Sequence, residues 1–440
     1  MLSLQSNRAV TTIRRVGVYV GGIRRANSWR GIVGVAAFGL VVATTSPSLA
    51  EPTQYTLSDI IELAIDRNPA IAGAQGVFDQ SQGQQIVSAA IPNPSFTAQS
   101  GRGALRDPSQ GSGLTEYGVT LSQPLEWPAK RGARQRVAEA GVARATVGMQ
   151  ETRLHLVTEV KTAFYELLLA RQEVDLAKQN LNNFIEVARI VKARVTSGEA
   201  PQFESIKAEV EVLKAKQQVA KALTAERVKQ VTLDTMTSGA LGSAYAIQGD
   251  FASLPGQLDV QVLLARALDQ HPTLHRLNHA VDQARRSVDY ERTARVPNLT
   301  VTGGYWREIG REAVTGAVSV PTPLWYRQQG EIATAMGATR QAEAEWFRAR
   351  NELKRAVNQH YQDARTAAEL LDVYEKGLLK QAQEALRIAR FSFQQGASSL
   401  LEVLDAQRVQ RQLVLDYAQA RFDLSISLVR LERAVGGPLS

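Results

Sequence analysis

Two short stretches decide how this chain is organised: "VTSGEAPQFESIKAE" at 195–209 and "FQQGASSLLEVLDAQ" at 393–407. In each stretch a helical pattern stops at a glycine, and a glutamate follows six residues later. Glycine often ends a helix, because it adopts the left-handed backbone conformation without a steric penalty. The chain therefore contains one helical corner twice, which indicates an internal duplication.

The duplication extends well beyond the two corners. Three further segments of the first half return in the second: "LAIDRNPAIA" (63–72) as "RALDQHPTLH" (266–275), "AAIPNPSFTAQSG" (89–101) as "ARVPNLTVTGG" (294–304), and "SQPLEWPAKRG" (122–132) as "PTPLWYRQQG" (321–330). Similarity that recurs at a nearly constant interval is the mark of repeated structural units. We therefore expect one repeat at 51–254 and a second at 255–440.

Each repeat has the pattern of a helix, a β-hairpin, a very long helix and another helix. Prolines end the first helix of each repeat, and short alternating stretches follow. The predicted elements are hairpins at about 95–124 and 298–323, long helices at about 130–196 and 328–395, and last helices at about 201–236 and 399–435. Apolar residues recur every three to four positions along the first long helix, a spacing typical of supercoiled helices. A simple coiled coil is the alternative for these segments alone.

The basic excess of the chain lies in its first 50 residues. Lys and Arg number 51 against 43 Asp and Glu, and the first 50 residues hold six arginines and no acid: Arg8, Arg14, Arg15, Arg24, Arg25 and Arg30. The remaining residues are close to neutral, so the charge does not indicate nucleic-acid binding. The chain has no cysteine, which excludes disulfides, thiolate metal sites and lipidation on a cysteine.

The first 50 residues resemble an export signal. A short apolar stretch, "GIVGVAAFGLVVA" at 31–43, is followed by small residues that predict cleavage after Ala50. A mitochondrial presequence is the alternative, because the region is rich in arginine and lacks acids. No later stretch reaches the roughly 18 apolar residues that a transmembrane helix needs, so we expect none.

The predicted strands have one apolar and one small, polar face. Tyr117, Val119 and Leu121 alternate with Gly118, Thr120 and Ser122. Aromatic residues gather near the strand ends: Trp127, Trp325 and Tyr326 on the helix side, Tyr305 and Trp306 on the loop side. Such aromatic girdles are typical of outer-membrane barrels, whereas the alternative is a small sheet packed on helices. A barrel needs about eight strands to close, so a chain with four must share it with at least one other chain.

These motifs together resemble the TolC family of outer-membrane efflux proteins. The resemblance implies a mainly α-helical chain with a small β part, assembled as a trimer. Its twelve-stranded barrel, with four strands from each chain, would continue into a long periplasmic α-helical barrel. The segments "SQPLEWPAKRG" (122–132) and "PTPLWYRQQGEI" (321–332) are further similar to the branch that serves heavy-metal pumps of the resistance–nodulation–division type. A periplasmic adaptor or another structural coiled-coil protein is the alternative function.

The resemblance also assigns roles at the two corners. Glu402 and Asp405, with Glu204 as the counterpart in the first repeat, would form carboxylate rings at the periplasmic aperture. The corner residues would contact a periplasmic adaptor protein: Gly198, Ala200, Gly396, Ser398 and Ser399. An inner-membrane pump would supply the energy, and the outer-membrane lipid would surround the barrel. We expect metal cations or small toxic compounds as the cargo, although the sequence does not decide between a metal, a drug and a polypeptide.

No catalytic or cofactor motif is evident, so we expect neither an enzyme nor a cofactor. One histidine series is suggestive, because His271, His275 and His279 would share a face of a continuous helix and could bind a metal ion. However, Pro272 places His271 at a helix start, where Asn68 stands in the first repeat. A capping role for His271 is therefore the alternative to a metal site.

Overall fold

The computed structural model describes residues 53–103, 114–242, 244–256, 258–308 and 311–439. The expected export signal and most of the first hairpin's loop lie outside these residues. All of the described residues belong to one compact unit, Pro52–Ser440. Among them, no helix has both the length and the apolar character to cross a membrane.

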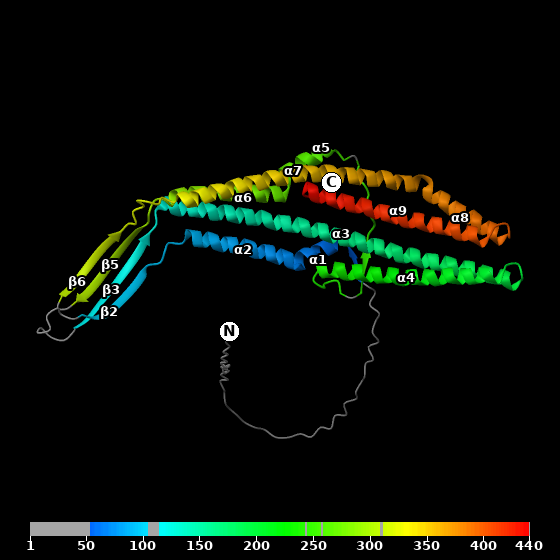
Figure 1. The fold of residues 1–440 in the computed structure, drawn as a ribbon, viewed down its shortest axis with the longest axis horizontal. Helices are drawn as coiled ribbons and strands as arrows, with labels where there is room; N and C mark the ends of the chain where they lie inside the picture. The colour runs from blue at the N-terminus through cyan, green and yellow to red at the C-terminus, as the bar shows by residue number, and fades with distance from the viewer. Residues whose placement is uncertain (1–52, 104–113, 243, 257, 309–310, 440) are drawn as a thin grey trace, which may run out of the picture. The chain divides into compact units, whose positions relative to one another are not determined.

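Both repeats have the same order of elements (Figure 1). The first repeat contains α1 (Leu57–Arg67), α2 (Pro69–Ala89), β2 (Ser95–Gly103), β3 (Leu114–Leu125), α3 (Pro128–Thr196) and α4 (Gln202–Met236). The second contains α5 (Val260–Gln270), α6 (Pro272–Thr293), β5 (Leu299–Glu308), β6 (Arg311–Ser319), α7 (Gln329–Val373), α8 (Leu379–Gln394) and α9 (Leu400–Val435). With 69 residues, α3 is roughly 100 Å long at 1.5 Å per residue.

The four long strands form one antiparallel sheet in the order β2-β3-β5-β6. The sheet therefore joins the two hairpins through β3 and β5 and leaves β2 and β6 as its edges. One face carries small polar groups, where the hydroxyls of Ser122 and Thr302 are hydrogen-bonded at 2.9 Å. Within the unit, β3 leads into α3 and β6 leads toward α7, so the sheet and the two glycine corners lie at opposite ends of the long helices (Figure 1).

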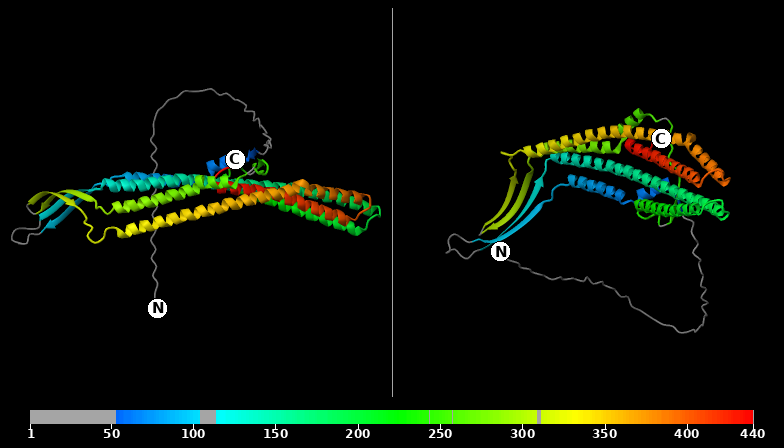
Figure 2. Two further views of the ribbon diagram at one scale, coloured as in Figure 1. Left: turned by 90° about the horizontal axis from the view of Figure 1, so that it is seen from above. Right: turned by 45° about the vertical axis from the view of Figure 1, so that its right-hand side comes forward.

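The helices follow the order of the strands. At the sheet end α2 packs on α3, α3 on α6, and α6 on α7, so α2 and α7 are the outer helices. Toward the corners α4 packs on α3, α3 on α9, and α9 on α8, so α4 and α8 take the outer positions (Figures 1 and 2). Three elements on each margin, one strand and two helices, thus lack a neighbour on one side among the described residues.

The second long helix is interrupted, which differs from the continuous helix predicted over 328–395. A π-helical turn, η2 (Tyr374–Leu378), separates α7 from α8. Gly377 lies inside it with φ 174°, an extended conformation outside the helical range. Gly377 lies as far before the corner glycine Gly396 as Gln179 lies before Gly198 in the first repeat. At Gln179 the helix α3 continues without a break. The lack of a side chain at Gly377 lowers the intrinsic stability of the helix there.

A two-stranded parallel sheet was not predicted. It pairs β1 (Thr53–Thr56) with β4 (Tyr245–Gln248). Tyr245 and Ile247 of β4 join the largest core cluster together with Phe164 of α3. This sheet thus attaches the start of the described chain and the link between the repeats to the middle of α3.

The first helix of each repeat is divided by a cap rather than continuous. Asn68 accepts a hydrogen bond from the backbone N–H of Ala70 and donates one to the carbonyl of Met236 at the end of α4, at 2.8 Å. His271 makes the equivalent contacts in the second repeat. Its Nδ1 accepts from Thr273 N–H at 3.1 Å, and its Nε2 lies 3.0 Å from the carbonyl oxygen of Arg433 near the end of α9.

These contacts fix the protonation of His271. Nδ1 must be unprotonated to accept from Thr273, so Nε2–H donates to Arg433 and the ring is neutral. The side chain is buried, and desolvation lowers its pKa below the ordinary value. A proton on Nδ1 would also set two N–H groups against each other and remove the cap of α6.

We therefore expect the contact between α6 and α9 to weaken in acid. Because the folded pKa is lowered, the neutral ring contributes its full stability above the ordinary pKa of 6.5. That contribution is lost as the pH falls through the lowered pKa of the folded protein. Hydrogen exchange at the start of α6 and the end of α9, corrected for the intrinsic pH dependence of exchange, measures this loss.

His271→Asn is the matched control, since it copies the cap that Asn68 provides in the first repeat and does not titrate. In this variant the acid-dependent loss of protection should disappear at α6 and α9. A decline of equal size in both proteins would show that another group is responsible.

Candidate functional site

The two corners have the same backbone geometry. Gly198 and Gly396 have φ angles of 80° and 73°, in the left-handed region that favours glycine. After each glycine the next residue donates to a carbonyl five positions back, Glu199 to Arg194 at 2.8 Å and Ala397 to Ser392 at 2.8 Å. This pattern is the Schellman ending of a helix. Both repeats therefore have glycine at this position because the helix ending requires the left-handed backbone conformation.

The two corners are joined by a shared core and by one arginine. The core consists of apolar residues of α3, α4, α8 and α9: Val187, Val191, Ala208, Phe393, Leu400 and Val403. Arg194 of the first corner lies over the Phe393 ring, 4.8 Å from its centroid, and donates to the Phe393 carbonyl. The two turns are thus held side by side at one end of the long helices.

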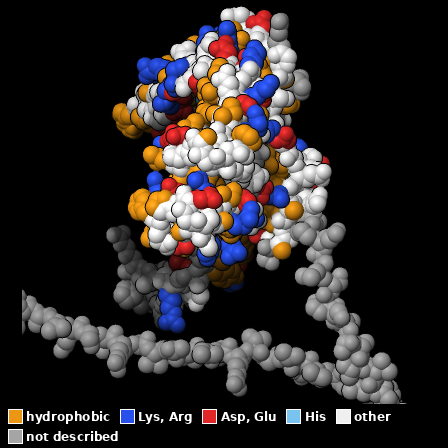
Figure 3. Space-filling model, turned by 90° about the vertical axis from the view of Figure 1, so that its right-hand side faces the viewer, with side chains coloured by type: hydrophobic (Ala, Val, Ile, Leu, Met, Phe, Trp, Pro, Cys, Tyr) orange, Lys and Arg blue, Asp and Glu red, His pale blue; other side chains and the backbone are white. Residues whose placement is uncertain are grey.

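The surface of the turns is open and built from small residues. A Cβ added to Gly198 or Gly396 would have no atom within 4 Å. Ala200 is half-buried, and Ser398 is half-buried with its hydroxyl directed to the carbonyl of Ala389. Ser399 is exposed and is the N-cap residue of α9. Figure 3 faces this end and shows basic and acidic side chains interspersed with apolar ones.

The three candidate carboxylates lie in the helices that leave the corners. Glu402 is exposed in the first turn of α9, where Ser399 accepts a hydrogen bond from its backbone N–H at 3.4 Å. Glu204 is half-buried in the first turn of α4. Both positions are favoured by the helix dipole. Stabilisation of these helix starts is therefore sufficient to explain why glutamates occur at Glu204 and Glu402, without any bound ligand.

Asp405 has a partner that the sequence analysis missed. Arg408, one turn further along α9, forms an ion pair with Asp405, and both side chains are exposed. Exposed pairs of this kind contribute roughly 0–1 kcal/mol, so the contact is easily exchanged for another. The spacing of three residues could have revealed it in the sequence. With Glu402, Asp405 and Arg408, each chain carries one net negative charge here rather than two.

The aromatic residues at the sheet do not share one face. Gly118 pairs with Trp306, and Val119 pairs with Tyr305, so the two aromatic side chains point to opposite sides. The Trp306 ring covers Gly118 so closely that a Cβ there would lie 2.3 Å from the ring. Trp306 therefore belongs to the small, polar face, and only Tyr305 joins the apolar one.

The other three aromatics lie beyond the strand ends. Trp127 donates its indole N–H to the carbonyl of Pro297 at 2.8 Å. The Tyr326 hydroxyl is bonded to Glu331 at 2.6 Å and accepts from Gly330 N–H at 3.0 Å, so this ring packs on the start of α7. Trp325 is 91% exposed, the highest value among the large apolar residues that the structure describes as exposed.

The structure gives the histidine series no metal-binding geometry. Both ring nitrogens of His271 are occupied, and His275 Nε2 lies 2.7 Å from the carbonyl of Asp269. Within the described ranges, no three His, Asp or Glu side chains are grouped so that they could hold a metal ion. His271 is instead the N-cap residue of α6.

The architecture defines a class: two repeats of helices and hairpins with one shared antiparallel sheet. The model of the outer membrane efflux protein family matches residues 60–239 and 263–437. The chain belongs to this family. It is therefore an efflux channel protein of the outer membrane, with a periplasmic helical part.

Known relatives span most of this chain. The cobalt-zinc-cadmium resistance protein CzcC of Cupriavidus metallidurans is 25% identical over 364 residues, which cover 82% of this chain and 85% of that protein. The pyoverdine export outer membrane protein OpmQ of Pseudomonas putida is 24% identical over 409 residues, which cover 87% of this chain and 86% of that protein. A crystal structure of CusC has a TM-score of 0.73 at 18% identity and covers 87% of this chain and 92% of that one.

Proposed function

We propose that three copies of this chain form a closed duct from the periplasm to the exterior and that the duct exports metal cations. The observation that carries the proposal is the four-stranded sheet, whose two outer strands have no further partner strand within the described ranges. β2 and β6 run in opposite directions, so β6 of one copy can pair with β2 of the next as an antiparallel ladder. Three copies would give twelve strands and leave no unpaired edge, which lipid does not tolerate.

The outer helices support the same closure. Toward the corners, α4 exposes an apolar stripe at helical spacing: Phe203, Ile206, Val210 and Leu213. α8 exposes Ile388 and Phe391 on the opposite margin of the chain. In a ring of copies, α8 of one chain and α4 of the next become neighbours, and their apolar stripes cover each other. The helical wall would then continue the barrel.

Metal cations are the favoured cargo because of the relatives. CzcC is named for cobalt, zinc and cadmium resistance, and CusC for cation efflux. The duct would be passive, and an inner-membrane pump, of the resistance–nodulation–division type, would drive export through a periplasmic adaptor. The corner carboxylates are compatible with this cargo, since carboxylate rings attract and hold cations.

We assign the narrow periplasmic aperture to the Glu402 and Asp405 rings, with Glu204 nearby. In a trimer the Arg408 side chains lie within the same ring and partly offset its charge. The resting channel should therefore prefer cations only moderately. A multivalent cation could displace Arg408 from Asp405 and bridge carboxylates of different copies, which would close the aperture.

Conductance in planar bilayers tests the aperture. Arg408→Gln removes the internal partner of Asp405, so cation preference and block by periplasmic trivalent cations should both increase several-fold. The double variant Glu402→Ala with Asp405→Ala should lose both properties together. Arg292→Gln is the control, because Arg292 forms the same type of pair with Asp289 in α6, toward the sheet. Unchanged selectivity in the first two variants would place the aperture elsewhere.

We further propose that the corners receive the adaptor. Gly198, Ala200, Gly396, Ser398 and Ser399 offer small side chains and open space, so adaptor helices could approach the backbone closely. A tryptophan at either glycine would fill that space. Export should then be abolished while the trimer still assembles.

Gly239 provides the matched control for this experiment. It has φ 81° and open space around its Cβ, like the corner glycines, but follows α4 at its far end. Each Gly→Trp change should cost about 1–2 kcal/mol of local strain, so strain is equal in all three variants. We expect loss of metal export with Gly198→Trp and Gly396→Trp at normal protein levels, and normal export with Gly239→Trp. Equal export in all three would refute the docking role.

A further inference from the structure

Two apolar patches remain uncovered where the helices meet the sheet. The first, called here the junction patch, consists of Ile86 and Val87 of α2 and Ile91 just beyond it, with exposed fractions of 73%, 71% and 65%. The second, called the loop anchor, consists of Leu324 and Trp325, at 65% and 91%. Large apolar side chains gathered in this way mark a surface that another molecule covers.

The loop anchor is held away from its own chain by a braced loop. The Leu324 N–H donates to the carbonyl of Thr322 at 2.9 Å, and the Tyr326 hydroxyl donates a hydrogen bond to the Glu331 carboxylate at 2.6 Å. Gln328 ends the loop in the left-handed conformation, with φ 60°. This conformation is uncommon for a residue other than glycine, so the surrounding contacts determine it. The Trp325 ring is therefore presented outward before any partner binds.

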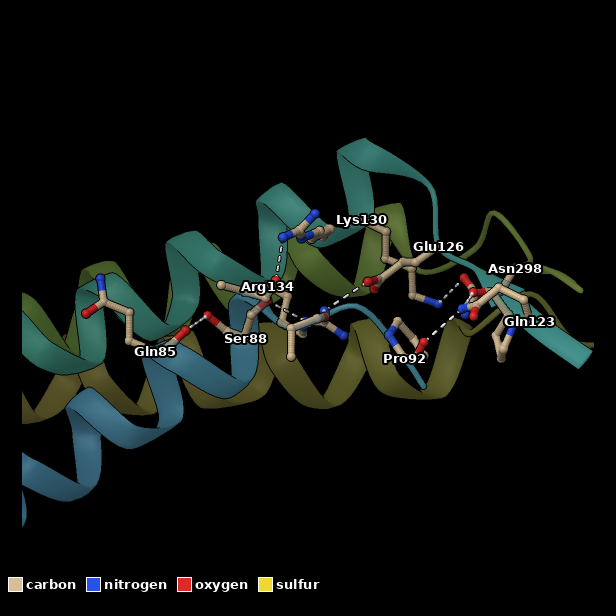
Figure 4. A network of polar contacts seen from close by, with 12 residues as sticks. Gln85, Ser88, Pro92, Gln123, Glu126, Lys130, Arg134 and Asn298 are labelled. Carbon is tan, nitrogen blue, oxygen red and sulfur yellow. Dashed lines mark hydrogen bonds and ion pairs between the residues drawn. The ribbon is translucent and has the colours of Figure 1, made fainter. Parts of the chain in front are cut away.

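The junction patch rests on a polar clamp, drawn in Figure 4. Arg134 of α3 donates to the carbonyls of Ser88 and Ala90, both at 3.0 Å, and pairs with Glu126 at 2.9 Å. Arg131 donates to the carbonyl of Ala89. These bonds satisfy the last carbonyls of α2 and fix its end. The patch is thus a rigid surface that loses little conformational entropy on binding.

The clamp is specific to the first repeat. The repeated segment ends in Gly132 in the first repeat and in Gly330 in the second. Counted from these glycines, Gln329 and Ile332 of the second repeat stand where the first has Arg131 and Arg134. The tryptophans also differ: Trp127 is 51% exposed and bonded to the carbonyl of Pro297, whereas Trp325 at the matching position is 91% exposed. The two repeats therefore present different surfaces at this level, a clamped helix end in the first and a more projecting aromatic in the second. Such a pair of unlike surfaces suits head-to-tail contact between copies of one chain.

We infer that the loop anchor of each copy seats on the junction patch of the next copy. This inference rests on the proposed trimer and names a contact within it. β6 ends at Ser319 and leads into the loop anchor, whereas the junction patch immediately precedes β2 at Ser95. An antiparallel ladder between β6 and the next β2 brings these two ends together. Trp325 is then an anchor between copies rather than a residue of the lipid interface.

Cysteine cross-linking tests the contact, and the chain is suited to it because it contains no cysteine. The variants are Val87→Cys with Trp325→Cys, and Ile91→Cys with Leu324→Cys, in the full-length protein extracted from membranes. Oxidation or a short bis-maleimide should yield covalent dimers and trimers and nothing larger, because the ring closes at three. Val77→Cys with Trp325→Cys is the control, since Val77 is exposed on α2 roughly 15 Å from Val87 along the helix. It should not cross-link.

Native mass spectrometry of the same samples separates the two ways to fail. A trimer that yields no cross-link in either test pair would overturn this contact and leave the proposed duct intact. The absence of a trimer would overturn both. Cross-linking of the control pair as efficient as that of the test pairs would also contradict the contact, because it would reflect collision rather than a fixed interface.

Tryptophan quenching tests the competing occupant, lipid. In a variant that retains Trp325 as the single tryptophan of the mature chain, vesicles of brominated phospholipid should leave the fluorescence unchanged. Strong quenching would assign Trp325 to the lipid interface and refute its seat on the next copy.

Discussion

The unpaired edges of the four-stranded sheet are the constraint on which the remaining structure depends. β2 and β6 have backbone groups with no partner among the described residues, and a membrane offers no water to satisfy them. The order of the helices repeats the order of the strands, so each margin of the chain ends in one strand and two helices. A single closure between copies would therefore complete the sheet and the helical wall together.

The internal duplication provides these margins both in the sheet and in the helical part. Two copies of one unit yield four strands, and the first repeat lies beside the second both in the sheet and in the row of helices. The repeats have also diverged where their positions require it. Arg131 and Arg134 clamp the end of α2, whereas the second repeat has Gln329 and Ile332 at the matching positions. The η2 turn likewise occurs in one long helix and not in the other.

Local signals in the sequence explain much of the fold. The corner glycines, the prolines at the helix starts and the alternation in the strands each follow from backbone sterics, and the structure has helices and strands at those places. Gly198 and Gly396 have the left-handed conformation that their role as helix ends requires. A mainly helical channel protein with a small sheet was predicted, and the family match and the similar solved structures confirm it.

Other features depend on contacts between distant residues and could not be read from periodicity. The β1–β4 pair involves strands of only four residues each, too short for an alternating pattern to be distinct. Alternation along β5 already places Tyr305 and Trp306 on opposite faces, but the register against β3 decides that Trp306 shares the small, polar face with Gly118. The Asp405–Arg408 pair, in contrast, joins residues only three positions apart in one helix and could have been predicted from the sequence. It lowers the net charge of the proposed aperture.

Native mass spectrometry of the protein, extracted from the outer membrane and held in lipid nanodiscs, tests the central claim most directly. The account predicts a single species of three chains that persists on dilution, because closure of the sheet edges is required for stability in lipid. A monomer that remains folded in lipid, with β2 and β6 still protected from hydrogen exchange, would contradict it.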